Sequence, residues 1–190
     1  MTVAWVFPGQ GSQKIGMANQ IINLPNAKKR FHYASKVFDR ELFDICEQVS
    51  EKNNLEEDLN NTKNTQICLF LVESVLLDSL KENGFKPNYI AGHSLGEITA
   101  LYCADVLSFE DSVLLIKERS KLMADAAKGS MAALIGFDRG QLDLMVEEID
   151  ELVIANDNSD SQVVLSGSEK ALDNISKRIT CKRFLKLNVS

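Results

Sequence analysis

The pattern of apolar and polar positions predicts an α/β fold for the longer, N-terminal part of the chain. Residues 3–7 form a short apolar run, typical of a buried strand, that leads into the loop sequence PGQGSQ. Residues 89–91 form a second short run of this kind. Apolar residues recur at helical spacing over 27–38, 41–50, 65–83, 98–107 and 108–127. Because strands and helices alternate, we predict a parallel sheet with helices on its faces.

Polar and helix-breaking residues mark the limits of these elements. Residues 50–64 are polar and rich in turn formers, which predicts a surface connection. Gly84 is expected to end the helix over 65–83, and Pro87 prevents its continuation.

The pattern changes after about residue 128. Strands are predicted over 131–137, 151–156, 161–167 and 182–189, and helices over 139–150 and 168–179. A polar turn over 157–161 joins the second and third of these strands. The order βαββαβ is typical of a ferredoxin-like unit. We therefore predict two domains: a large α/β lobe over 1–128 and a ferredoxin-like small lobe over 129–190.

Composition and charge exclude several classes of function. The chain has 190 residues, of which 45% are hydrophobic and 25% charged, as in ordinary soluble globular proteins. The net charge of -6, with no basic stripe, argues against nucleic-acid binding. The longest apolar stretch, Ile67 to Leu77, contains Glu73 and is too short for a membrane span. With no signal peptide at the N-terminus, we expect no membrane partner and a cytoplasmic location.

The four cysteines are widely spaced, without a CxxC pair or a nearby histidine cluster. This spacing predicts reduced, mostly buried thiols rather than a metal site. No metal or bound cofactor is implied.

The candidate chemistry begins with the GxSxG sequence at residues 92–96, between a predicted strand and a predicted helix. In such a nucleophile elbow Ser94 has strained backbone angles, and Gly92 and Gly96 let strand and helix approach closely. The backbone N–H of Leu95 would then favour a developing oxyanion at the helix N-terminus. The alternative is that Ser94 is a simple N-cap residue.

The loop after the first strand offers a second oxyanion donor. Glycines on both sides of Gln10 allow a backbone N–H to point into a cleft. A plain strand-to-loop turn is the alternative.

Taken together, these motifs resemble malonyl-CoA:acyl-carrier-protein transacylases. The resemblance rests on residues 7–13 (FPGQGSQ), residues 92–97 (GHSLGE) and Arg119 within KERSKLM. It also rests on residues 155–156 and 158–159 within IANDNS. They occur in that family's order, at similar spacing, over essentially the whole chain. The family includes separate acyltransferases that serve fatty-acid and polyketide synthases. The resemblance implies a hydrolase-like lobe with an inserted ferredoxin-like lobe.

The resemblance also implies a two-step reaction. Ser94 would attack the thioester of malonyl-CoA and form a malonyl-enzyme, while backbone N–H groups of Gln10 and Leu95 hold the oxyanion. The malonyl group would then pass to the phosphopantetheine thiol of an acyl carrier protein. Malonyl-CoA and acyl carrier protein are therefore the expected partners, and coenzyme A enters only as part of the substrate.

Four further residues are implied in substrate binding. Arg119 would pair with the free carboxylate of the malonyl group, for which an arginine fork is well suited. Its alternative is a solvated or salt-bridged surface arginine. Gln66 would border the acyl pocket, and a polar residue at a helix start is the alternative. His93 would line the cleft or cap a backbone group, and Asn156 lies in the IANDNS motif.

The general base is the weak point of this interpretation. The chain contains only His32 and His93, and neighbouring side chains diverge at an elbow, so His93 is a poor base for Ser94. In the family, the base follows the last strand of the small lobe, in a segment that begins where this chain stops, at 188–190. We therefore expect an N-terminal portion of a longer transacylase, whose missing C-terminal portion is a further possible partner.

Two other hypotheses stay open at this point. A serine esterase or thioesterase could use the same elbow, but it explains neither Arg119 nor the pairing of the two glycine-containing motifs. An inactive fragment that binds carrier protein is the non-catalytic alternative.

Overall fold

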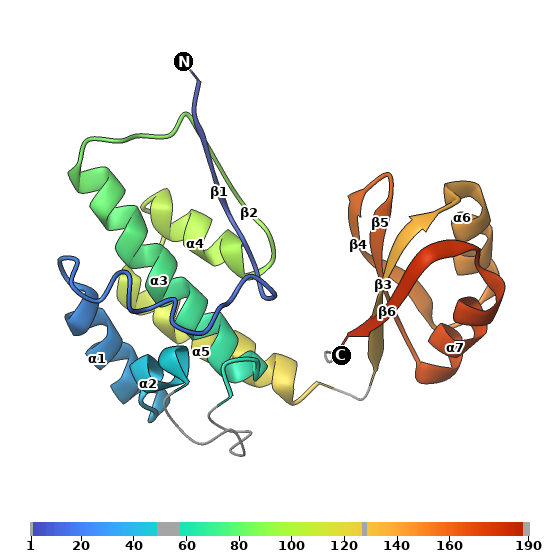
Figure 1. The fold of residues 1–190 in the computed structure, drawn as a ribbon, viewed down its shortest axis with the longest axis horizontal. Coiled ribbons are helices and arrows are strands. Elements are labelled where there is room, and N and C mark those ends of the chain that lie inside the picture. Colours follow the sequence, from blue (N-terminus) through green and yellow to red (C-terminus); the bar gives the residue numbers. More distant parts are fainter. Residues whose placement is uncertain (1, 49–57, 127–128, 188–190) are drawn as a thin grey trace. The chain divides into compact units, whose positions relative to one another are not determined.

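The computed structural model describes residues 2–48, 58–126 and 129–187, and the chain forms two compact units, Met1–Ala124 and Asp125–Ser190 (Figure 1). The domain boundary predicted at Lys128 lies outside the described residues. So does most of the surface connection predicted over 50–64.

The first unit combines a short parallel sheet with a group of helices. Its elements are β1 (Ala4–Phe7), α1 (Ala27–Phe38), α2 (Leu42–Glu47), α3 (Thr62–Glu82), β2 (Tyr89–Gly92), α4 (Leu95–Cys103) and α5 (Phe109–Ala124). Strands β1 and β2 pair in parallel, from Ala4 opposite Tyr89 to Phe7 opposite Gly92. The predicted mixed α/β fold with a parallel sheet is thus confirmed.

Local capping explains where the helices differ from the prediction. Helix α3 begins three residues earlier than expected because the Asn61 side chain accepts a hydrogen bond from the Lys63 N–H at 3.0 Å. It ends as predicted, since Gly84 adopts φ +81° and its N–H donates to the Lys81 carbonyl. Helix α4 is shorter than the predicted 98–107 at its C-terminal end, where Asp105 has a left-handed φ of 57°.

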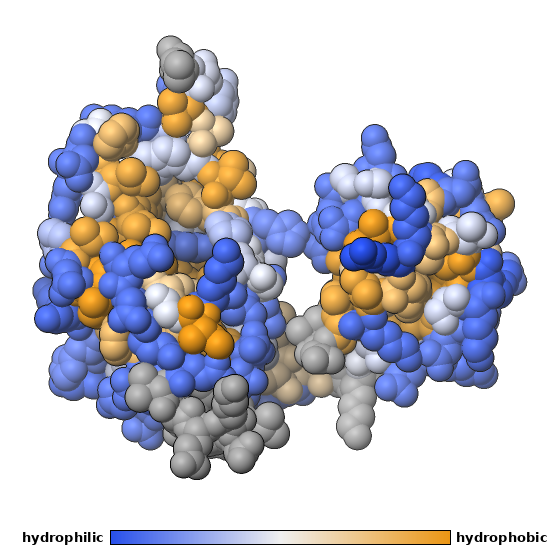
Figure 2. All heavy atoms as spheres, in the orientation of Figure 1, coloured by the Kyte–Doolittle hydropathy of each residue, from blue (hydrophilic) through white to orange (hydrophobic). Residues whose placement is uncertain are grey.

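Helix α3 is the central element of the first unit, because it contacts α1, α2, α4 and α5. It contributes Ile67, Phe70 and Leu71 to a core in which all three are fully buried. The sheet is less covered than the helices: Val6 of β1 is 69% exposed and Tyr89 of β2 is 67% exposed. Figure 2 accordingly shows apolar atoms at the surface where these two strands lie.

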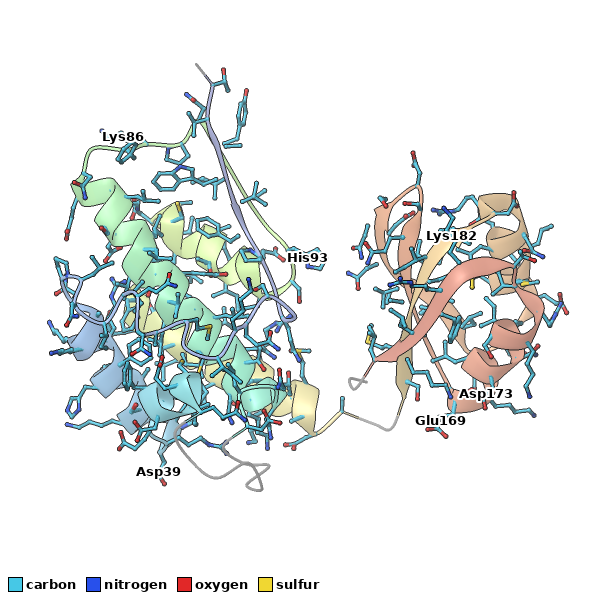
Figure 3. All side chains as sticks on the ribbon, in the orientation of Figure 1. Asp39, Lys86, His93, Glu169, Asp173 and Lys182 are labelled. Carbon is cyan, nitrogen blue, oxygen red and sulfur yellow. The ribbon has the colours of Figure 1, made fainter. Side chains whose placement is uncertain are left out.

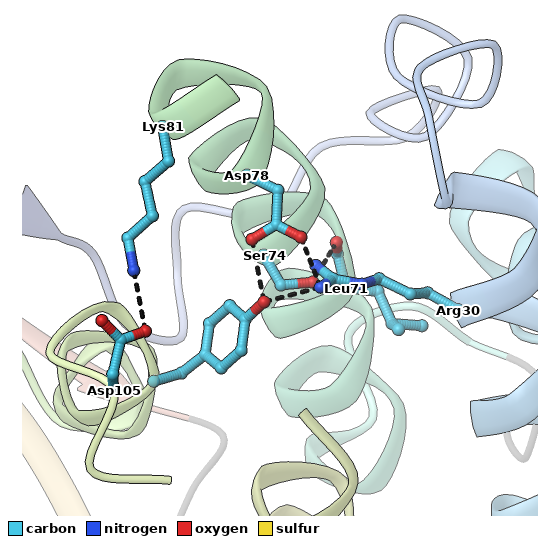
Figure 4. A network of polar contacts seen from close by, with 7 residues as sticks. Arg30, Leu71, Ser74, Asp78, Lys81 and Asp105 are labelled. Atoms are coloured by element: carbon cyan, nitrogen blue, oxygen red, sulfur yellow. Dashed lines mark hydrogen bonds and ion pairs between the residues drawn. The ribbon is translucent and has the colours of Figure 1, made fainter. Parts of the chain in front are cut away.

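A buried polar network joins helices α1, α3 and α4 of this unit (Figure 4). Arg30 of α1 pairs with Asp78 of α3 at 2.5 Å and donates to the Tyr102 hydroxyl of α4 at 2.6 Å. That hydroxyl donates to Asp78 at 2.8 Å, and burial together with this carboxylate raises the pKa of Tyr102 to about 12. The guanidinium also lies 4.6 Å from the ring centroid of Phe109 in α5.

The second unit is built around an antiparallel sheet. Its elements are β3 (Ser130–Phe137), α6 (Arg139–Glu148), β4 (Leu152–Ser159), β5 (Gln162–Gly167), α7 (Glu169–Arg178) and β6 (Cys181–Leu187). The strand order is β4-β5-β3-β6, and every neighbouring pair is antiparallel. Its core includes Leu134, Leu142 and Leu165, which are fully buried.

The polar turn predicted over 157–161 is wrong in its extent. Strand β4 continues to Ser159, because irregularities in its register keep the polar end paired with β5. Asp157 is also held by Arg139, whose Nη1 lies 2.7 Å from the carboxylate. The end of the strand predicted over 182–189 lies outside the described residues beyond Leu187.

The cysteines agree with the sequence prediction. All four are free thiols; Cys46, Cys68 and Cys103 are buried and Cys181 is half-buried. None of the helices in the described ranges combines the length and the apolar character that a membrane span requires.

Candidate active site

Ser94 occupies a sharp turn between β2 and α4, with φ 55° and ψ -110°. The predicted backbone strain is therefore confirmed. The flanking glycines are sterically required. A Cβ on Gly92 would lie 2.0 Å from the Gly96 carbonyl oxygen, and one on Gly96 would lie 2.1 Å from that of Phe7. The GxSxG spacing thus allows strand and helix to meet at this serine.

The hydroxyl of Ser94 does not cap the helix, so the simple N-cap alternative is wrong. Ser94 stands at the N-cap position of α4, but its side chain makes no capping hydrogen bond. Its Oγ instead accepts a hydrogen bond from Nη2 of Arg119 at 3.0 Å. The side chain is exposed, so the hydroxyl is accessible to a substrate.

The Gln10 loop packs directly against this turn. A Cβ on Gly9 would lie 2.5 Å from the His93 carbonyl oxygen and 3.3 Å from Cβ of Ser94. The backbone N–H of His93 donates to the Phe7 carbonyl at 3.0 Å. Leu95 is the first residue of α4, where backbone N–H groups have no acceptor inside the helix. The loop backbone at Gly9, one residue before Gln10, therefore lies against the nucleophile turn, and Leu95 follows Ser94 directly.

Arg119 and Gln66 are hydrogen-bonded to each other beside Ser94. Arg119 projects from α5 and is half-buried, and its Nη1 donates to Oε1 of the fully buried Gln66 in α3. Burial lowers the pKa of Arg119, and the charge of Glu97 acts in the opposite direction. Arg119 is therefore not a solvated surface arginine, and Gln66 is more than a polar residue at a helix start.

A cleft of about 600 Å³ opens beside these groups. Its lining is mainly apolar and comes from α4 and α5: Ser94, Glu97, Ile98, Leu101, Leu115, Glu118, Arg119, Leu122 and Met123. The Ser94 hydroxyl, the Arg119 guanidinium and two glutamate carboxylates thus line a cleft with five apolar side chains. An apolar cleft with a few polar groups is typical of a site for a small ligand.

Of the remaining candidate residues, His93 lies beside Ser94, whereas His32 and Asn156 belong to other elements. His93 is exposed at the end of β2, where Figure 3 shows it at the turn into α4. His32 is exposed on α1. Asn156 belongs to β4 of the second unit, where it pairs with Val164. Within the first unit, Ser94, Arg119 and Gln66 come together beside the Gln10 loop.

One residue of this cluster, Thr62, was missed from the sequence. Its hydroxyl donates to Oε1 of Gln10 at 2.9 Å and accepts from Nε2 of Gln66 at 3.1 Å. The sequence feature that could have identified Thr62 is its position four residues before Gln66, because this spacing places both side chains on one face of a helix. The helix was predicted to start only at residue 65.

In the parts of the chain that the structure describes, no group of three or more His, Cys, Asp or Glu side chains could hold a metal ion. The cluster beside the cleft consists of a serine hydroxyl with a guanidinium and an amide as neighbours.

Comparison with known proteins assigns this arrangement to a family. A family model for the acyl transferase domain matches residues 4–190. The chain belongs to this family.

Relatives of this acyl transferase chain carry a more specific name. The chain is 42% identical over 190 residues to the malonyl CoA-acyl carrier protein transacylase of Synechocystis sp.. The matched region covers 100% of the chain and 63% of that relative. The chain is 35% identical over 199 residues to the Bacillus subtilis protein of the same name, covering 99% of the chain and 61% of that relative. The chain therefore spans somewhat less than two thirds of the length of these relatives.

Solved structures give the same picture. The crystal structure of the Synechocystis transacylase superposes on the acyl transferase chain with a TM-score of 0.92 at 41% identity, covering 100% of this chain and 63% of that one. A malonyl-transacylase solved in complex with its type II polyketide synthase acyl-carrier protein has a TM-score of 0.86 at 34% identity, with the same coverage.

Proposed function

We propose that this chain is the nucleophile-bearing part of a malonyl-CoA:acyl-carrier-protein transacylase that serves fatty-acid or polyketide synthesis. The observation that carries the proposal is the 3.0 Å contact between the Arg119 guanidinium and Oγ of the strained Ser94. This contact puts a nucleophile beside a cation that can bind a carboxylate. Such a pair suits an acyl group that carries a second, free carboxylate, as malonyl does.

The proposed reaction has two steps. Ser94 Oγ attacks the thioester carbonyl of malonyl-CoA, the carbon–sulfur bond breaks, and coenzyme A leaves as its thiol with the serine proton. The phosphopantetheine thiol of the carrier protein then attacks the serine ester, a new thioester forms, and Oγ regains a proton. Backbone N–H groups of Gln10 and Leu95 are assigned to the oxyanion in both steps. The packing of the Gln10 loop against the elbow supports this assignment.

Arg119 is assigned to selection of the acyl group. When malonyl-CoA binds, its free carboxylate replaces Ser94 Oγ as an acceptor for the guanidinium, while Gln66 keeps hold of Nη1. An acetyl group would offer no carboxylate to a half-buried cation, and this difference favours malonyl. The assignment of His93 and Asn156 to substrate binding rests on the resemblance of their motifs.

Arg119 cannot act as the proton acceptor for Ser94. Arginine only donates hydrogen bonds and stays protonated, so it orients Oγ without taking its proton. We assign the acceptor to a residue outside these 190 positions, as the resemblance implies. The experiment below tests this by supplying imidazole as a base in solution.

The proposal extends to fold, partners and location. The strand order β4-β5-β3-β6 supports a ferredoxin-like small lobe in addition to a hydrolase-like large lobe. The complex of a related transacylase with its carrier protein supports acyl carrier protein as the partner. No metal or cofactor is proposed apart from coenzyme A within the substrate, and the proposed location is the cytoplasm.

The test is the intact mass of the protein after brief incubation with malonyl-CoA, with and without imidazole in the buffer. We expect a malonyl adduct on the wild type that is absent from Ser94→Ala. The expected adduct forms faster with imidazole than without it, because the free base replaces the missing acceptor.

Three controls give the experiment its meaning. Acetyl-CoA in place of malonyl-CoA should yield little adduct, and Arg119→Met should remove the preference for malonyl. An adduct on Ser94→Ala would show that another group is the nucleophile. A wild-type protein that stays unmodified at every imidazole concentration would assign this chain to a non-catalytic role.

A further inference from the structure

A continuous line of hydrogen bonds joins the nucleophile to the oxyanion loop through three side chains. It starts at Ser94 Oγ, passes through the guanidinium of Arg119 to Gln66, continues to the hydroxyl of Thr62, and ends at the side chain of Gln10. The two distances at Thr62 are 3.1 Å to Gln66 Nε2 and 2.9 Å to Gln10 Oε1. The line thus connects α5, α3 and the loop after β1.

The direction of every bond in this line follows from Arg119. Arginine has donors only, so the Gln66 atom that faces it must be the carbonyl oxygen Oε1. The Gln66 amide Nε2 then points at Thr62, and the Thr62 oxygen accepts its hydrogen. The Thr62 hydrogen is left to donate, and it does so to Oε1 of Gln10. A single donor-only residue therefore fixes the orientation of two glutamine amides, with Thr62 as the intermediate.

The geometry of α3 makes Thr62 suited to this place. Thr62 is the first residue of α3 and is half-buried, and Gln66 lies one turn later on the same face. A hydroxyl can both accept and donate, which the line requires at this point. A valine of the same shape could do neither, and Gln66 Nε2 would keep only the weak acceptor Sδ of Met123, at 3.3 Å.

We propose that Thr62 is a positioning residue that couples the carboxylate-binding Arg119 to the oxyanion loop at Gln10. This inference rests on the proposed function of the site and adds a role for a residue that acts through its hydrogen bonds to Gln66 and Gln10. Without the hydroxyl, Gln66 loses the bond that holds its amide orientation, and the guanidinium loses its fixed partner. Binding of the malonyl carboxylate is then weakened more than the attack by Ser94.

The test compares Thr62→Val, which keeps the shape, with Thr62→Ser, which keeps the hydroxyl. The first readout is the side-chain amide signals of Gln10 and Gln66 in proton–nitrogen NMR spectra of the whole chain. We expect Thr62→Val to move both pairs of signals and Thr62→Ser to leave them close to wild type. Thr180→Val, an exposed position in the second unit, is the control for a threonine-to-valine exchange elsewhere.

The second readout is the rate of malonyl loading, in imidazole buffer, as a function of malonyl-CoA concentration. For Thr62→Val we expect the KM for malonyl-CoA to rise about tenfold with a much smaller change in kcat, and Thr62→Ser to restore the KM. A merely structural defect would lower the active fraction, and hence kcat, without this split.

The two readouts separate the inference from the proposed function. If the wild type does not load malonyl, the proposed function fails and the amide signals alone decide on Thr62. The inference is overturned if Thr62→Val leaves the Gln10 signals in place, or if it loads malonyl with the wild-type KM.

Discussion

Both units of this chain carry ion pairs at the surface, such as Lys81–Asp105 in the first unit, but the first unit also holds an ion pair in its interior. In the second unit, the ion pairs Arg139–Asp143, Arg139–Asp157, Arg178–Glu148 and Lys186–Asp173 join side chains that are between 37% and 62% exposed. In the first unit, the side chains of Arg30 and Asp78 are 11% and 23% exposed. The second unit has an apolar core with a charged surface, whereas the first carries hydrogen-bonded charge into its interior.

This difference predicts which substitutions lower the stability of each unit. Surface ion pairs contribute little to stability because water screens them. A buried cation depends on every partner, since removing one leaves the other without compensation. The buried groups of the first unit also join α1, α3, α4 and α5, of which three contribute residues to the candidate site. We therefore expect equivalent substitutions to have unequal effects in the two units.

The largest contrast is expected between two glycine-to-alanine substitutions. In Gly96→Ala the new Cβ would lie 2.1 Å from the Phe7 carbonyl oxygen, so β1 and α4 must separate. In Gly140→Ala it would lie 3.4 Å from the Asp138 carboxylate, an ordinary contact. We expect Gly96→Ala to destabilise the first unit by more than about 4 kcal/mol, and Gly140→Ala to stabilise α6 by about 0.5–1 kcal/mol.

The chain has one tryptophan, Trp5 in β1, so its fluorescence reports unfolding of the first unit alone. Amide hydrogen exchange reports the second unit. A Gly96→Ala protein with a wild-type Trp5 transition would contradict the close packing described for the elbow.

The next contrast is between two arginines that each have an acidic partner. Arg30→Met removes the cation from Asp78 and Tyr102 inside the first unit, whereas Arg178→Met removes a partner of Glu148 at the surface. We expect Arg30→Met to lower the free energy of unfolding by about 3–5 kcal/mol. Arg178→Met should change it by less than about 1 kcal/mol.

Urea unfolding followed by Trp5 fluorescence measures the first variant, and hydrogen exchange of α6 and α7 measures the second. Equal losses of unfolding free energy in the two variants would show that burial does not make the Arg30–Asp78 pair more important for stability than the Arg178–Glu148 pair.

The sequence predicted those parts of the site that depend on neighbours along the chain. The strain at Ser94 and the need for Gly92 and Gly96 follow from a tight strand-to-helix turn, which a short motif determines. The contacts of Arg119 could not be predicted in this way. Its partners Ser94 and Gln66 lie 25 and 53 positions away, so their contacts depend on how α3, α4 and α5 pack.

The same reason explains what was missed elsewhere. Thr62 joins Gln10 across 52 positions, and Arg30 joins Tyr102 across 72. The extent of β4 was mispredicted because its polar end, through Ser159, has the composition of a turn. The register irregularities that keep it paired with β5 have no signature in residue type.

The smallest contrast concerns two carboxylates whose pKa values move in opposite directions. Glu73 of α3 accepts a hydrogen bond from Thr99 of α4 at 2.5 Å, and its other oxygen is buried without a partner in the described ranges. Burial raises the pKa of Glu73 from 4.5 to about 7, although the Thr99 bond acts to lower it. In the second unit, Arg178 lowers the pKa of Glu148 at the surface.

The sign of each effect on stability follows from proton binding. Between pH 4.5 and about 7 the folded first unit holds a proton on Glu73 that the unfolded chain releases, so its stability falls as the pH rises through this window. The loss is at most about 3 kcal/mol and is complete above pH 7. The contribution of Glu148 has the opposite sign, because it is present above the ordinary glutamate pKa and is lost as the pH falls.

We therefore expect Glu73→Gln to be more stable than the wild type at pH 8 and nearly equal to it at pH 4.5, since the amide carries no charge to bury. Its carbonyl oxygen can still accept from Thr99, which keeps the contact between α3 and α4. Urea titrations followed by Trp5 fluorescence from pH 4.5 to 8 measure the difference. Glu148→Gln, followed by hydrogen exchange, is the matched control and should leave the pH dependence of the first unit unchanged. A wild-type slope that persists in Glu73→Gln would place the titrating group elsewhere in the first unit, and the unpartnered Glu73 oxygen would then have no effect on stability.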